Sequence, residues 1–191
     1  MLKLPKIILA SGSPRRAEIL NAVGWEFEKH PADVDEAEFF GEKPADYVRR
    51  LAQSKAETVA EKSPGALVLG ADTIVVAGDR IIGKPKNLIK AAEMLQTLSG
   101  RWHEVLTGVA LVKISGGEKT AEVNHQITRV KFAEMNDVET KFLVEKGEPL
   151  DKAGAYAVQA QAALFIEKIE GDYWNVVGLP INLVYQMLRA F

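Results

Sequence analysis

Short apolar runs alternate with amphipathic stretches along the first half of the chain. Residues 7–10 (IILA) form the first run, and a brief, wholly apolar segment of this kind is typical of a buried strand. Over 14–23 the apolar positions recur every three or four residues, which predicts a helix that ends before Gly24. By the same criteria the chain continues with strand 25–30, helix 44–62, strands 67–69 and 74–76, and helix 87–99.

Longer β-type runs dominate the second half. Residues 105–112 and 121–132 flank a Ser-Gly-Gly turn, and this pattern predicts a hairpin. The remaining predicted elements are a helix from Asn136 or Asp137 to Lys146, a second hairpin made of 162–169 and 173–177, and a last helix over 179–189. Helices that alternate with strands early and hairpins late predict the α/β class, with a mixed sheet and flanking helices.

Composition narrows the function classes. The 24 Lys and Arg against 26 Asp and Glu give a net charge of −2, which argues against a protein that mainly coats nucleic acid or an anionic membrane. With no cysteine, disulfides, thiol nucleophiles and cysteine metal sites are excluded. No apolar run approaches the ~18 residues that span a bilayer, and residues 1–6 offer no signal-peptide core. A soluble, cytoplasmic protein is expected, with 191 residues in one domain, which could form two lobes.

The segment from Ser11 to Arg16 (SGSPRR) follows the first predicted strand and opens the first predicted helix. Ser13 suits the N-cap and Pro14 the first helical position. Arg15 and Arg16 then occupy the first helical turn, where the helix dipole disfavours cations. Free backbone N–H groups beside two arginines suit a phosphate ligand. The alternative is a capped surface helix whose arginines pair with nearby acids.

Asp72 interrupts an otherwise apolar stretch at the expected end of a buried strand. A carboxylate in such a place needs a partner, a metal ion or a raised pKa, so we favour a functional role. The alternative is a turn residue before Thr73. Replacing Asp72 by Asn should leave the fold equally stable or slightly more stable, because it relieves desolvation and repulsion from neighbouring acids.

Two lysines have patterns that suit an anion. Lys55 falls on the apolar stripe of predicted helix 44–62, so its side chain either extends to the edge of the helix face or meets a negative charge; spacing alone favours the first. Lys84 lies in a Gly-Lys-Pro loop and could contact a phosphate. A P-loop is excluded because Pro85 stands where a Ser or Thr would bind Mg²⁺.

Acidic and polar segments complete the candidate set. The run 33–38, which includes Asp35, could supply oxygen ligands to Mg²⁺ or be a solvated loop. Residues 151–156 (DKAGAY) and Gln159 could read the edge of a base or form a turn before a strand. The three histidines, His30, His103 and His125, have no ligand spacing and are interpreted as structural.

Taken in order, these segments resemble the Maf family. The matching motifs are LASGSPRR at 9–16, LGADT at 69–73, GKP at 83–85, LSG at 98–100, DKAGAY at 151–156 and VGLP at 177–180. The resemblance implies one domain over 1–191 with a fold like that of inosine triphosphate pyrophosphatases, an elongated mixed sheet in two lobes around a cleft. It also implies an enzyme that hydrolyses a nucleoside triphosphate to the monophosphate and pyrophosphate with a divalent cation, Mg²⁺ or Mn²⁺.

The resemblance further implies roles for single residues. Asp72 matches the proton-accepting acid, and Asp35 falls near a second important acid, so both are expected to hold the metal. Polar or cationic positions of the cleft are matched by Ser11, Arg15, Lys55 and Lys84. The residues Arg15, Thr73 and Gln159 match positions that separate subfamilies and indicate the branch acting on dTTP and UTP. Gln161-Ala162-Ala163 departs from the pattern, because a Gly-rich turn is expected there.

The implied reaction is attack of a metal-assisted water on the α-phosphorus, in a protein that clears nucleotide pools or arrests cell division. A nucleotide sensor without turnover and a nucleic-acid-binding module are the alternatives. Balanced charge weighs against the second, and neither stable nucleic-acid binding nor a membrane partner is expected. The resemblance leaves open the physiological pyrimidine nucleotide, the preferred metal, a homodimer and the division of roles between the carboxylates.

Overall fold

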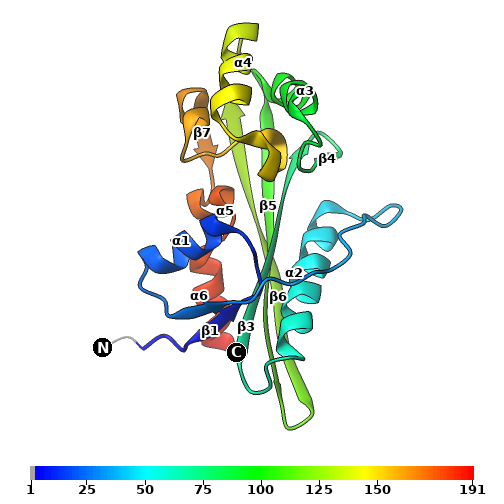
Figure 1. Ribbon diagram of the computed structural model, residues 1–191, viewed down its shortest axis with the longest axis vertical. Coiled ribbons are helices and arrows are strands. Elements are labelled where there is room, and N and C mark those ends of the chain that lie inside the picture. The colour runs from blue at the N-terminus through cyan, green and yellow to red at the C-terminus, as the bar shows by residue number, and fades with distance from the viewer. Residues whose placement is uncertain (1–2) are drawn as a thin grey trace. The chain divides into compact units, whose positions relative to one another are not determined.

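The structure is a computed structural model that describes residues 3–191 (Figure 1). Contacts between Cα atoms divide these residues into two compact units. The first contains residues 3–72, Thr107–Gln126 and Gly178–Phe191, and the second contains Thr73–Leu106 and Ile127–Val177. Three long strands, β3 (Leu67–Ala77), β5 (Trp102–Ser115) and β6 (Glu118–Phe132), contribute residues to both.

The first unit is a sheet with the strand order β2-β1-β3-β5-β6. Strand β1 (Ile7–Leu9) pairs in parallel with β2 (Phe27–Lys29) and with β3, so that Ile7 lies opposite both Phe27 and Leu67. The helices of this unit are α1 (Pro14–Ala22), α2 (Pro44–Ala60) and α6 (Ile181–Ala190). The predicted elements of this region are confirmed, with ends that shift by a few residues, except that 67–69 continues without a break into 74–76.

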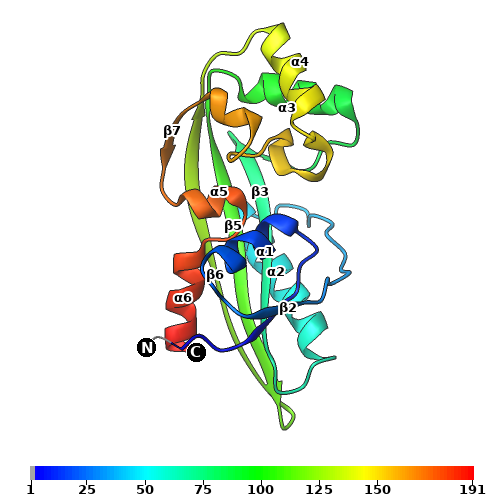
Figure 2. The same cartoon turned by 60° about the vertical axis from the view of Figure 1, so that its left-hand side comes forward.

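The second unit continues β3, β5 and β6 and adds two antiparallel edge strands. Strand β4 (Arg80–Ile82) pairs with β3, and β7 (Ile166–Glu170) pairs with β6, with Arg129 opposite Glu170. Helices α3 (Leu88–Leu98) and α4 (Asp137–Lys146) pack side by side, as Figure 2 shows. The short helical elements are the 3₁₀ turns Pro149–Asp151, Ala153–Ala155 and Gln161–Leu164, together with α5 (Tyr173–Val177). Parallel and antiparallel pairs together confirm the predicted mixed sheet.

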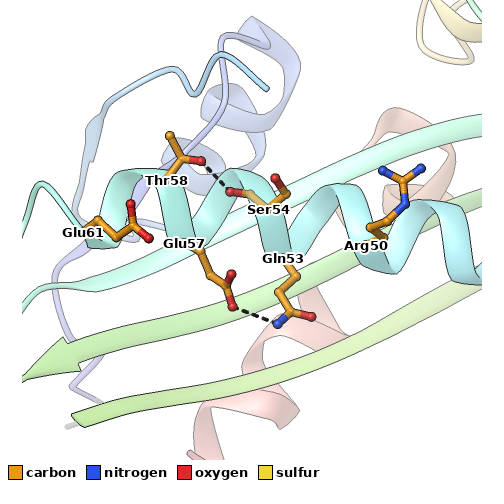
Figure 3. Close-up of a pocket in the computed structure, with 6 residues that line it drawn as sticks. All are labelled: Arg50, Gln53, Ser54, Glu57, Thr58 and Glu61. Atoms are coloured by element: carbon orange, nitrogen blue, oxygen red, sulfur yellow. Dashed lines mark hydrogen bonds between the residues drawn. The ribbon is translucent and has the colours of Figure 1, made fainter. Parts of the chain in front are cut away.

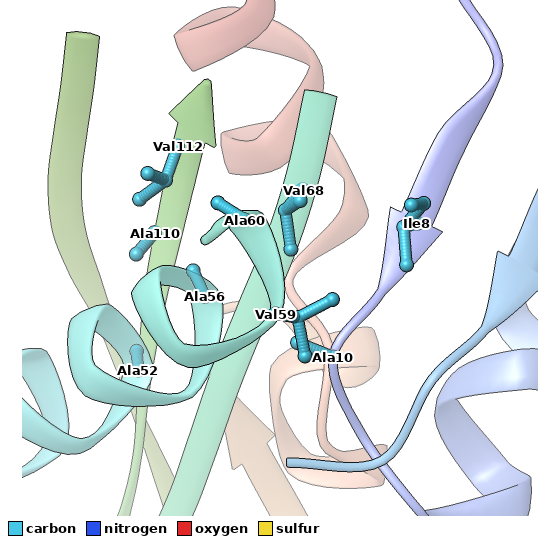
Figure 4. Packing of buried hydrophobic residues seen from close by; sticks show 9 residues of the cluster. All are labelled: Ile8, Ala10, Ala52, Ala56, Val59, Ala60, Val68, Ala110 and Val112. Carbon is cyan, nitrogen blue, oxygen red and sulfur yellow. The ribbon is translucent and has the colours of Figure 1, made fainter. Parts of the chain in front are cut away.

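Helix α2 lies unusually close to the strands of the first unit. Its small residues pack on the sheet in a cluster of alanines and valines (Figure 4). A Cβ atom at Gly70 of β3 would lie 2.1 Å from the carbonyl oxygen of Ala52, and one at Gly108 of β5 would lie 2.1 Å from that of Val48. No side chain fits at either glycine, so the backbone of α2 rests directly on two strands.

Two sequence predictions of local structure are wrong. Residues 67–77 form one continuous strand, so Asp72 lies inside β3 and is not a turn residue. Residues 162–177 do not form a hairpin, because β7 takes β6 as its partner and 173–177 is helical. Asp172 accepts a hydrogen bond from the backbone N–H of Trp174 (2.8 Å), which supports a helical turn. Short apolar runs do not distinguish these alternatives.

The predicted helix starts are confirmed at α3 and α4. The side chain of Asn87 accepts a hydrogen bond from Lys90, and Asn136 with Glu139 forms a reciprocal capping box. Ser13 takes the N-cap position of α1 but makes no side-chain capping bond. Within residues 3–191, no helix has the length and apolar character that crossing a membrane requires.

His103 is buried in the second unit, as its structural interpretation requires. Its Nε2 lies 2.8 Å from the hydroxyl of Tyr156, and its ring makes edge contacts with Phe132 and Tyr156. Burial lowers the pKa of His103 from 6.5 to about 4, because a charged imidazolium would lose its hydration there. The neutral ring is therefore the form that the fold stabilises.

We expect this burial to make stability depend on pH. The folded pKa lies below the unfolded value, so the contribution is complete above pH 6.5 and is lost as the pH falls towards 4. Urea unfolding at pH 7 and pH 4 should show the wild type losing about 3 kcal/mol more than His103→Gln. Parallel pH profiles for the two proteins would contradict the burial of a neutral His103, and His30→Gln, at an exposed position, serves as the control.

Candidate active site

A buried ion pair joins helix α2 to strand β3. The Nζ of Lys55 lies 2.7 Å from Oδ1 of Asp72, and the two side chains are only 10% and 11% exposed. Lys55 therefore faces an anion and does not extend to the edge of the helix face, which corrects the interpretation favoured by spacing alone. Because Asp72 has a cationic partner, the expectation that Asp72→Asn leaves the fold as stable also loses its basis.

A second carboxylate reaches the same ammonium group. Oε1 of Glu36, from the acidic loop between β2 and α2, lies 2.5 Å from Nζ of Lys55. The predicted metal ligand Asp35 instead accepts a hydrogen bond from the backbone N–H of Ala37 (2.9 Å). Lys55 thus lies between two carboxylates, and the acid of this loop that meets it is one residue beyond the one that the sequence singled out.

The side chains of Ser11 and Arg16 are hydrogen-bonded to each other at the start of α1. Nη1 of Arg16 donates to Oγ of Ser11 (2.8 Å), Nε of Arg16 donates to the carbonyl of Gly178 (2.8 Å), and the backbone N–H of Ser13 also donates to Oγ of Ser11 (3.2 Å). Burial lowers the pKa of the Arg16 guanidinium, and the charge of Asp72 opposes that shift.

The two hydrogen bonds that Ser11 accepts determine which further hydrogen bonds its hydroxyl can make. A hydroxyl has one donor and two acceptor sites, and both acceptors are used within the described chain. The hydroxyl proton is thus the group that Ser11 can offer to an anion. Arg15, which precedes Arg16 on α1, is half-buried, whereas Arg16 is buried. Spacing alone does not distinguish the two arginines, and their burial does.

Three predicted site residues belong to the second unit. Thr73 follows Asp72 on β3 and is half-buried; successive side chains of a strand point to opposite faces. Lys84 and Gln159 are both exposed. The carbonyl of Gly83 accepts a hydrogen bond from the backbone N–H of Gly154 (3.1 Å), which ties the loop of Lys84 to the DKAGAY segment.

Gly154 explains part of that segment. Its φ is +68°, and a Cβ atom there would lie 2.9 Å from Cγ2 of Val75 on β3. Only glycine combines this backbone conformation with so close an approach. The glycine of this segment therefore allows its backbone to pack closely against β3. The small residues of the segment did not by themselves predict this packing.

A separate hollow runs along the outward face of α2 (Figure 3). It has a volume of about 430 Å³ and is lined by Arg50, Gln53, Ser54, Glu57, Thr58 and Glu61. Gln53 donates to Glu57 (2.8 Å), and the hydroxyl of Thr58 donates to the carbonyl of Ser54 (2.8 Å). None of the predicted site residues lines it, so we do not take it as the active site.

The acids around Lys55 fit a divalent cation that is shared with a substrate. No group of three or more His, Asp or Glu side chains within residues 3–191 could enclose a metal ion by itself. Mg²⁺, however, commonly takes only one or two protein carboxylates and completes its coordination with substrate phosphates and water. Asp72 and Glu36, which both contact Lys55, are the two carboxylates that would hold such a cation.

The mixed sheet, its flanking helices and the buried cluster of charged side chains define an α/β protein. The chain belongs to the Maf family: the family description "Maf-like protein" matches residues 6–191. A dTTP/UTP pyrophosphatase of Symbiobacterium thermophilum is 50% identical to it, over 98% of this chain and 95% of the relative. One of Geotalea uraniireducens is 52% identical, over 96% and 93%.

A solved structure agrees with the fold. The Staphylococcus aureus Ham1 protein superimposes with a TM-score of 0.56 over 97% of this chain and 99% of its own, at 14% sequence identity. At this identity the likeness concerns the fold alone. It confirms the predicted fold class, in which helices flank a mixed sheet.

Proposed function

We propose that this chain is a nucleoside triphosphate pyrophosphatase that hydrolyses dTTP and UTP to the monophosphate and pyrophosphate. Curated relatives 48–52% identical to it over nearly their whole length carry the name dTTP/UTP pyrophosphatase. The observation that carries the chemistry is the buried pair of Lys55 and Asp72 with Glu36 beside it. A sensor without turnover would need cations for the phosphates but no such carboxylates.

Asp72 is the proposed proton acceptor. Its carboxylate accepts a hydrogen bond from Lys55 through Oδ1, so Oδ2 can take the proton of the attacking water. Lys55 holds the carboxylate in one orientation, which is what a general base requires. Attack at the α-phosphorus then expels pyrophosphate.

Cationic and hydroxyl groups are proposed to bind the triphosphate. These are the hydroxyl of Ser11, Arg15, Lys55 and Lys84, which would stabilise the charge that develops on the leaving group. A divalent cation, Mg²⁺ or Mn²⁺, would be held by Asp72 and Glu36, and Asp35 stays a predicted ligand. When bound, it polarises phosphate oxygens and acidifies water.

Base selection is proposed to rest on Arg15, Thr73 and Gln159. The amide of Gln159 is exposed and offers both a donor and an acceptor, which a uracil or thymine edge can pair with. A cytoplasmic location, a homodimer, a cleft between two lobes and the role in nucleotide-pool clearance or division arrest stay predictions.

Turnover of a panel of nucleotides tests the function. With Mg²⁺, pyrophosphate release from dTTP and UTP should exceed that from GTP and ATP by about 10-fold or more. Asp72→Asn should lower release by about 10²–10⁴-fold, because it removes the proton acceptor. Asp79→Asn, an exposed acid on the turn after β3, is the matched control and should keep full activity. Equal rates for all four nucleotides would overturn the pyrimidine assignment.

Gln159→Glu tests base selection. Replacing the amide by a carboxylate removes the donor and adds a charge, so kcat/KM for dTTP and UTP should fall by about 10-fold or more. Inhibition by pyrophosphate, which has no base, should stay unchanged. Gln161→Glu, two residues further on, is the matched control. An unchanged ratio of dTTP to GTP turnover in Gln159→Glu would show that this amide does not read the base.

A further inference from the structure

The acidic loop between β2 and α2 keeps Glu36 on Lys55 without regular structure, and apolar packing reaches only its start, where Ala32 contacts the core cluster. No helix or strand is formed within residues 30–43. Its two aromatic residues are outside the protein interior, since Phe39 is 59% exposed and Phe40 is fully exposed. Beyond Ala32, something other than apolar burial must therefore fix the loop.

Arg50 of α2 contacts three residues of this loop. Its Nε and Nη2 donate to both carboxylate oxygens of Glu42 (2.6 and 2.7 Å), and Nη2 also donates to the carbonyl of Ala37 (3.0 Å). Its guanidinium carbon lies 4.0 Å from the ring centroid of Phe39. A planar guanidinium that makes several hydrogen bonds orders a loop far better than a single exposed ion pair does.

Tyr47, one turn earlier on α2, holds the neighbouring carbonyl. Its hydroxyl donates to the carbonyl oxygen of Glu36 (2.8 Å). Burial, with the negative charges of Asp72 and Glu36, raises the pKa of Tyr47 to about 12, so the hydroxyl keeps its proton at neutral pH. Side chains of α2 thus hold two consecutive carbonyls, those of Glu36 and Ala37, which directly follow the Cα atom that carries the Glu36 side chain.

We propose that Arg50, assisted by Tyr47, is a positioning residue that holds the loop so that Glu36 meets Lys55 and Asp72. The role rests on the proposed function, since it matters for catalysis only if these acids act in the reaction. Arg50 acts through Glu36. A loop fixed at Ala37, Phe39 and Glu42 leaves the carboxylate of Glu36 little freedom, and displacement of a reacting group by about 1 Å can reduce rates 10²-fold.

Arg50→Gln tests the proposal, and the same substitution at the neighbouring Arg49 is the comparison. Arg49 pairs with Asp46 on the exposed face of α2, so Arg49→Gln is the matched control. Arg50→Gln should lower kcat/KM for dTTP by about 10- to 100-fold, whereas Arg49→Gln should stay within about 2-fold. Arg50→Lys should not restore activity, because an ammonium cannot bond Glu42 and Ala37 in the same geometry. Wild-type kcat/KM in Arg50→Gln would overturn the proposal.

A double variant separates positioning from general stability. If Arg50 acts through Glu36, then Glu36→Gln/Arg50→Gln should be no slower than Glu36→Gln alone. Losses that multiply would mean that Arg50 acts by another route, and the proposal would fall.

Hydrogen exchange gives a readout that does not need turnover. Amides of residues 35–42 should exchange faster in Arg50→Gln and at the wild-type rate in Arg49→Gln. Equal protection in all three proteins would overturn the role of Arg50. If the unmodified protein releases no pyrophosphate, the proposed function fails, and exchange alone then decides whether Arg50 holds the loop.

Discussion

The ion pair between Lys55 and Asp72 depends on how closely helix α2 approaches the sheet. At Gly70 of β3 and Gly108 of β5 there is no room for a Cβ atom against the carbonyls of α2. Lys55, one turn beyond Ala52 on the same face, is thereby brought to Asp72, two residues beyond Gly70. A bulkier residue at Gly70 would push the helix outward and separate the charges.

Burial sets the chemistry of this pair and of its neighbours. Two carboxylates face one ammonium, and the buried guanidinium of Arg16 also interacts with the charges of Asp72 and Glu36, so the two acids are balanced by two cations. The triphosphate of a bound substrate would add negative charge, and a divalent cation shared with its phosphates would offset that charge, as the proposed function requires. Glu36 joins the cluster through a loop that Arg50 and Tyr47 hold, and the same helix α2 therefore positions both the cation and the second acid.

The sequence predicted what periodicity and isolated polarity can reveal. Lys55 was recognisable as unusual because it lies on the apolar stripe of its helix, and Asp72 because it is a carboxylate inside an apolar run. It could not tell Glu36 from Asp35, because an irregular loop has no period that fixes the direction of a side chain. Nor could it find β7 as the partner of β6, since that pairing joins residues about 40 apart and short apolar runs suit strand or helix alike.

A double-mutant cycle on Lys55 and Asp72 tests the central claim most directly. The free energies of unfolding of Lys55→Met, Asp72→Asn and the double variant would be measured in urea at pH 7 without metal. Each single change should lower stability by about 1–3 kcal/mol, because it leaves a buried charge without its best partner. The double variant should lose at least about 1 kcal/mol less than the sum of the two. Strictly additive losses would show that the two side chains do not stabilise each other, and that the pair is not what holds the site.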